Sequence, residues 1–166
     1  RFFEQWPDNS ELSQKQLLAK LAMLLCLVSC RRVSDVQDLD LAGRVYSRDG
    51  VLLSISRRTK TFSRCIEYPL FPTNDKLCVV KCLKAYEDCS TQFRTDPNGQ
   101  LLYVLQKPFK PVLSVTLFRC VKWITAEAGI DVQSFGAHSP RGAMASKSYA
   151  LGSRLEDILK AKFKHI

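Results

Sequence analysis

Histidine is scarce in this sequence, and the usual spacing of a zinc site is missing. There are two histidines among 166 residues, and none of the seven cysteines belongs to a Cys-x-x-Cys pair. Zinc stays an alternative, because cysteine and histidine are its usual ligands. However, the pairs Cys26/Cys30 and Cys78/Cys82 have the spacing of one helix face. We therefore expect them to be reduced core thiols in a protein from a reducing compartment, and we expect no metal or other cofactor.

The sequence also lacks a long apolar segment. A membrane-spanning helix needs about 20 consecutive apolar residues. The most apolar run is Leu21–Ser29, which Lys20 and Arg31 close. No signal peptide is visible, and the start at Arg1 is interpreted as a position inside a longer protein whose N-terminal portion is missing. No membrane partner is therefore expected.

Acidic residues are outnumbered by basic ones. Lysine and arginine total 25 against 16 aspartates and glutamates, so the formal net charge is +9 and the pI is about 9.3. This excess favours a polyanionic partner, either nucleic acid or an anionic membrane surface, although a protein that is merely basic stays an alternative. Apolar residues form 46% of the chain, which is enough for the core of one domain.

Helical patterns occupy both ends of the sequence. Ser13 and Gln16 have the spacing of a capping box, which predicts a helix that begins there. Leucines recur at helical spacing after it, and Val28 continues the pattern, so a buried helix is predicted to about Cys30. A short helical piece is predicted at residues 33–39. Further helices are predicted at residues 74–92, 114–129, 140–151 and 154–161.

Strand-like segments lie between these helices. They are residues 44–46, 51–55 and 65–68, the last bounded by Pro69 and Pro72. Asp49-Gly50 is a strong signal for a hairpin turn between the first two strands. A polar, basic turn at residues 56–61 separates the second strand from the third. The order of helices, a small antiparallel sheet and more helices predicts an α+β domain that is mostly α and spans residues 1–166.

Four basic side chains stand out at the ends of predicted helices and in a predicted turn. Arg32 lies where the first long helix ends, Lys60 lies in the turn after the second strand, and His138 and Arg141 flank Ser139-Pro140 at the start of a later helix. Each is common alone as a solvated or structural residue. Together they offer two guanidinium groups, an imidazole and an ammonium, all of which can bind an anion.

These residues and their order resemble the catalytic domain of tyrosine recombinases, the phage integrase family. Arg32 followed by Val-Ser-Asp35 looks like the first arginine box, and residues 136–141 look like the His-x-x-Arg box. Lys60 lies where that family keeps its catalytic lysine. The resemblance covers about residues 6–161 and is closest to the recombinases of DIRS, Ngaro and Crypton-type mobile elements, through Trp-Pro-Asp-Asn at residues 6–9 and Arg-Gly-Ala-Met-Ala-Ser at residues 141–146.

The resemblance implies a helical recombinase catalytic domain whose N-terminal DNA-clamp domain lies outside this chain. It implies a site-specific recombinase or integrase that cuts and rejoins DNA through a 3′-phosphotyrosine intermediate without a metal. It also implies that the partner is double-stranded DNA, that the protein assembles with itself on DNA as a dimer or tetramer, and that it is located in the nucleus. The implied residues are, for catalysis, Arg32, Lys60, His138 and Arg141; for orienting Arg32, Asp35; and for DNA contact, Arg57, Arg58 and Ser139.

The nucleophilic tyrosine of that family is not visible where it is expected, after Ala161. Tyr149 follows Arg141 too closely on the same predicted helix and is interpreted as structural, and the other tyrosines lie in predicted strands or a core helix. Three explanations are open: a segment absent between Ala161 and Lys162, which the abrupt change there favours; a sequence that ends before the tyrosine; or lost catalysis. Alternative functions are a domesticated, inactive DNA-binding or assembly domain, a protein-interaction module, and a type IB topoisomerase.

Overall fold

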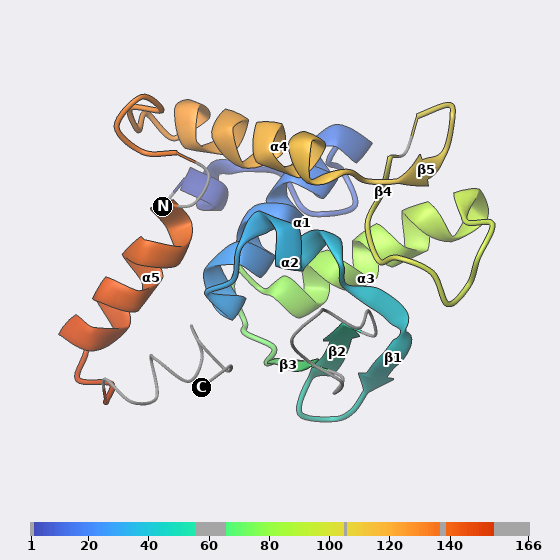
Figure 1. Cartoon of the computed structure of the whole chain (residues 1–166), viewed down its shortest axis with the longest axis horizontal. Helices are drawn as coiled ribbons and strands as arrows, with labels where there is room; N and C mark the ends of the chain where they lie inside the picture. The colour runs from blue at the N-terminus through green and yellow to red at the C-terminus, as the bar shows by residue number, and fades with distance from the viewer. Residues whose placement is uncertain (1, 56–65, 105, 137–138, 155–166) are drawn as a thin grey trace.

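The computed structural model describes residues 2–55, 66–104, 106–136 and 139–154 as an α+β fold in which helix accounts for 47%. Figure 1 shows a small sheet at the lower edge of the molecule and most of the helices above it. In chain order the elements are η1 (Phe2–Gln5), α1 (Gln14–Ser29), α2 (Val33–Gln37), β1 (Asp40–Tyr46), β2 (Val51–Ile55), β3 (Ile66–Leu70), α3 (Val79–Ser90), η2 (Thr91–Phe93), β4 (Tyr103–Val104), β5 (Lys110–Pro111), α4 (Ser114–Glu127) and α5 (Ser139–Ala150). The predicted fold class is confirmed at this level.

Helix α1 is the centre of the core. It packs against α2, α3, α4 and α5, and all its residues from Leu17 to Cys26 are buried. The predicted capping box is formed, because Ser13 Oγ accepts from the Gln16 N–H at 3.3 Å and Gln16 Oε1 accepts from the Ser13 N–H at 3.1 Å. The buried part of α1 was predicted to continue through Val28, but Val28 is 53% exposed.

The first sheet is antiparallel, with strand order β1-β2-β3. The predicted hairpin turn is confirmed: the Ser47 N–H donates to the Gly50 carbonyl at 2.8 Å, and Gly50 has φ of 150°. Pro69 was predicted to end the third strand. It lies inside that strand, opposite Leu52. Because β3 is the last strand in the sheet order, one side of it needs no backbone partner, and a proline is tolerated there.

Helix α3 begins later than the sequence pattern predicts. The side chain of Asp75 accepts from the Leu77 N–H at 3.0 Å and from Thr73 Oγ1 at 2.8 Å, which holds this segment in a turn. The helix then begins at Val79, with Cys78 Sγ accepting from the Lys81 N–H at 3.4 Å. The predicted start of this helix at residue 74 is therefore wrong, and Leu77, which precedes the helix, is 39% exposed.

A buried tyrosine joins α3 to a second, two-stranded sheet. Tyr86 donates its hydroxyl to the Tyr103 carbonyl and accepts from the Tyr103 N–H, both at 2.8 Å. Tyr103 lies in β4, which pairs with β5. This strand pair was not predicted from the sequence, because two-residue strands have no visible alternation.

The last two described helices agree with the predicted ones. Helix α4 ends just before Gly129, which has φ of 74°, and the Ile130 N–H donates to the Thr125 carbonyl at 3.1 Å, as in a common helix-ending motif. Helix α5 begins at Ser139, so Pro140 is its second residue. The helix predicted at residues 154–161 lies almost wholly outside the described residues.

The six cysteines in the described ranges are free thiols, four of them buried. Burial raises the pKa of the Cys26 and Cys82 thiols to about 12, so both stay protonated at neutral pH. Among the described helices, none combines the length and the apolar character that crossing a membrane requires.

Candidate functional site

Arg32 and Arg141, the two arginines predicted to act together, line one cavity of about 650 Å³. They come from opposite ends of the sequence. The other lining residues are Ser34 from α2 and Ser114 and Phe118 from α4. The fold therefore brings two guanidinium groups, two hydroxyl-bearing side chains and one aromatic ring to a common space.

The chain positions Arg32 by turning sharply after α1. Cys30 adopts a left-handed conformation with φ of 51°, which ends α1. Arg32 is then extended and precedes α2, and its backbone N–H donates to Asp35 Oδ2 at 3.2 Å. Asp35 thus bonds to the main chain of Arg32, and its predicted role of orienting the arginine side chain stays a prediction.

The neighbouring arginine has a different environment. Arg31 is 6% exposed, and its guanidinium carbon lies 5.4 Å from the centre of the Tyr68 ring. Tyr68 belongs to β3, so Arg31 packs between the end of α1 and the sheet. Arg32 is exposed and lines the cavity. Of this adjacent pair, the residue in the Arg-x-x-Asp pattern is therefore the one that can meet a ligand.

Arg141 is the third residue of α5 and is half-buried. Helix α5 packs against α1, and α2 packs against α4, so the walls of the cavity belong to one packed unit. Ser114 is the first residue of α4, where the positive end of the helix dipole lies. Two guanidinium groups beside a helix beginning suit an anion with several oxygens.

The one predicted DNA-contact residue within the described ranges is not part of the lining of this cavity. Ser139 lines a separate, mostly apolar cavity of about 560 Å³, together with Phe3 and Pro140. Tyr149 lies on α5 with Arg141, as predicted, but it is 63% exposed and contributes little to the core. The predicted residues Lys60, His138, Arg57 and Arg58 lie outside the described residues.

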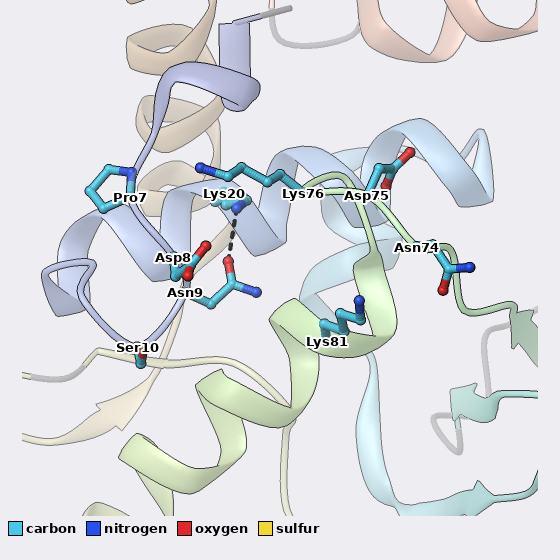
Figure 2. A pocket seen from close by; sticks show the side chains of 9 residues that line it. All are labelled: Pro7, Asp8, Asn9, Ser10, Lys20, Asn74, Asp75, Lys76 and Lys81. Carbon is cyan, nitrogen blue, oxygen red and sulfur yellow. Dashed lines mark hydrogen bonds between the residues drawn. The ribbon is translucent and has the colours of Figure 1, made fainter.

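A third, polar cavity was not predicted from the sequence. It has a volume of about 470 Å³ and contains Lys20, Lys76 and Lys81 (Figure 2). Lys20 was interpreted only as the residue that closes an apolar run. The signal was present, because a lysine in the middle of a buried helical pattern must have a polar partner inside the fold.

No cluster of three or more histidine, cysteine, aspartate or glutamate side chains with the arrangement of a metal site occurs in the residues that the structure describes. Neither a scan against protein-family models nor a search of curated proteins found a match to this chain. The geometry and charge of the cavity that Arg32 and Arg141 share are therefore the features of this chain that bear on its function.

Proposed function

We propose that this chain is the catalytic domain of a site-specific DNA recombinase or integrase of the tyrosine recombinase type, which cuts and rejoins DNA through a 3′-phosphotyrosine intermediate. The observation that supports this proposal best is that Arg32 and Arg141 line the same cavity. These are the arginines of the two sequence boxes, and they reach this cavity from separate segments, the extended residue before α2 and the first turn of α5. The net charge of +9 adds support, because duplex DNA is a polyanion.

The cavity fits the electrostatic demand of phosphoryl transfer. A phosphodiester repels an incoming phenolate, and the transition state increases the negative charge on the non-bridging oxygens. Guanidinium groups stay charged at any working pH and can bind two oxygens at once. Loss of one such preorganised donor typically raises the barrier by about 3–4 kcal/mol. In this proposal, Arg32 and Arg141 bind those oxygens, and Asp35 keeps Arg32 in place through its backbone.

The remaining roles are assigned by the resemblance. Lys60 protonates the leaving 5′-oxygen, and His138 donates to the phosphate or moves the proton of the nucleophile. The nucleophile is a tyrosine expected after Ala161. Arg57, Arg58 and Ser139 contact the DNA. The proposal includes no metal or cofactor, and it includes double-stranded DNA as partner, assembly on DNA as a dimer or tetramer, and a nuclear location.

The test is formation of a covalent adduct with a nicked DNA duplex by the natural full-length protein. A nick beside the cleavage site lets the leaving strand diffuse away, so the adduct accumulates and survives denaturing electrophoresis. We expect Arg32→Ala and Arg141→Ala each to lower the rate of adduct formation by a factor of about 10²–10³. Arg48→Ala is the matched control, because Arg48 is exposed in the β1–β2 turn and does not line the cavity.

The second candidate is a domesticated DNA-binding or assembly domain without catalysis. The observation that favours it is that no tyrosine is among the described residues that line the cavity of Arg32 and Arg141. This candidate predicts that the natural protein binds duplex DNA but forms no adduct, and that Arg32→Ala weakens binding only. A normal adduct yield from both arginine variants would contradict both candidates.

A further inference from the structure

Lys20 carries an ammonium group into the core of the fold. Its side chain is 1% exposed and lies in α1 among buried apolar residues. Its ammonium donates to Asn9 Oδ1 at 2.8 Å and lies 5.7 Å from the centre of the Phe3 ring. An ammonium has three N–H donors, and burial of an ammonium is costly unless these donors are satisfied. Desolvation by this burial lowers the pKa of Lys20.

The same ammonium faces a cavity that two further lysines line. Lys76 comes from the turn before α3, and Lys81 lies in the first turn of α3. Lys76 is held in place, because its ammonium donates to the Trp6 carbonyl at 2.8 Å. Figure 2 shows Lys20, Lys76 and Lys81 arriving from different segments around the space, with the Lys20–Asn9 hydrogen bond on one side.

Carboxylates and amides complete the lining. Asp8, Asn9, Ser10, Asn74 and Asp75 belong to it, so three cationic side chains face two anionic ones. Asp75 already accepts two hydrogen bonds within its own turn. A ligand that fits this mixture places an anionic group against the lysines and presents hydroxyl groups to the carboxylates and amides.

We propose that this cavity binds a terminal phosphate group, either inorganic phosphate or the phosphate monoester of a small hydroxylated molecule. The ammonium groups of Lys20 and Lys81 bind the phosphate oxygens, and that of Lys76 adds charge beside them. A diester phosphate of a DNA backbone is less suited, because its two flanking sugars would keep it from the buried Lys20. This site is separate from the cavity of Arg32 and Arg141 and does not depend on the proposed function.

The test is titration of the ¹⁵N-labelled full chain with inorganic phosphate and with ribose 5-phosphate at constant ionic strength. We expect saturable shifts of the amide resonances of Asn9 and Lys81. Lys20→Met should weaken binding by about tenfold or more, since a hydrogen bond from a charged donor is lost. Lys81→Met should weaken binding too. Lys122→Met, at an exposed position on α4, should leave it unchanged.

Four results would overturn the proposal. The first is the absence of saturable amide shifts with either probe, and the second is equal phosphate affinity of Lys81→Met and the unmodified chain. The third is that the amide shifts are confined to Ser34 and Ser114. The fourth is that the amides of Asn9 and Lys81 shift with duplex DNA but not with free phosphate. The third result would place the phosphate in the arginine cavity, and the fourth would make the DNA backbone the occupant. Lys81→Met decides the question even if Lys20→Met does not fold, because Lys81 is exposed.

Discussion

Arg31 and Arg32 show how strongly one step along the chain changes the use of a residue type. One guanidinium lies over a tyrosine ring inside the fold, and the next lines an open cavity. Composition cannot separate them, and the prediction of Arg32 depended on the aspartate three residues later. The left-handed Cys30 and the start of α2 explain the difference, because they reverse the chain between α1 and Arg32. The catalytic role of Arg32 stays a prediction.

Gly50 is expected to tolerate no side chain. A Cβ atom there would lie 2.0 Å from the backbone carbonyl oxygen of Leu70, and the residue has φ of 150°. Gly50→Ala should therefore lower the free energy of unfolding by about 2 kcal/mol or more, measured by urea denaturation. Gly136→Ala is the control, since a Cβ at Gly136 meets nothing within 4 Å. Equal stability of the two variants would contradict this account of the hairpin.

Lys20 should make the stability of the protein depend on pH. Its pKa in the folded state lies below the ordinary value of 10.5 because of desolvation, so the unfolded chain binds more protons between the two values. The free energy of unfolding of the unmodified chain should therefore rise relative to that of Lys20→Met as the pH increases toward about 10. Urea denaturation in phosphate-free buffer measures both proteins. Parallel pH profiles would show that Lys20 is not desolvated.

At the scale of elements, local chemistry was predictable and boundaries set by turns were not. The capping box of Ser13, the hairpin at Gly50 and the end of α4 at Gly129 depend on neighbouring residues, and the structure confirms them. The predicted start of α3 was wrong, because the Asp75 side chain accepts a hydrogen bond from the Leu77 N–H and holds this segment in a turn. The β4–β5 pair was missed, since two-residue strands leave no periodic pattern.

The capping box should contribute measurably to α1, the helix on which the others pack. Ser13→Ala removes the acceptor of the Gln16 N–H and should lower the free energy of unfolding by about 1 kcal/mol. Ser10→Ala serves as the control, because Ser10 is exposed and precedes the helix. Thermal or urea denaturation of the two variants gives the comparison. A loss of stability in Ser10→Ala as large as in Ser13→Ala would argue against a specific capping effect.

At the scale of the whole molecule, the two arginines of the candidate site were predictable from the sequence, but the cavity that they share was not. Arg32 and Arg141 were identified from two local patterns, and only the packing of α2, α4 and α5 decides that they share a cavity. The lysine cavity could not be assembled from the sequence, because Lys76 and Lys81 have no pattern in common with Lys20. A lysine among buried leucines predicts that a polar partner exists but does not show which residue it is.

Binding of duplex DNA should be strongly salt-dependent, because the chain carries a net charge of +9. Each phosphate contact adds about −0.9 to the slope of the logarithm of affinity against the logarithm of salt concentration. Arg32→Ala and Arg141→Ala should each make the slope shallower by about that amount, while Arg48→Ala should not. Fluorescence anisotropy with a labelled duplex measures these slopes. A salt-independent affinity would contradict every DNA-based function proposed for this chain.

The hydroxyl of Tyr86 makes hydrogen exchange at the Tyr103 amide a measure of how often the fold opens. It holds both backbone groups of Tyr103 where water does not reach, so the Tyr103 amide can exchange its proton for deuterium only after α3 and β4 separate. A ligand whose binding site is lost in this opening slows the exchange by the factor 1 + [L]/Kd. Neither Tyr86 nor Tyr103 lines either charged cavity, so slower exchange of this one amide would report occupancy without a direct contact to the ligand.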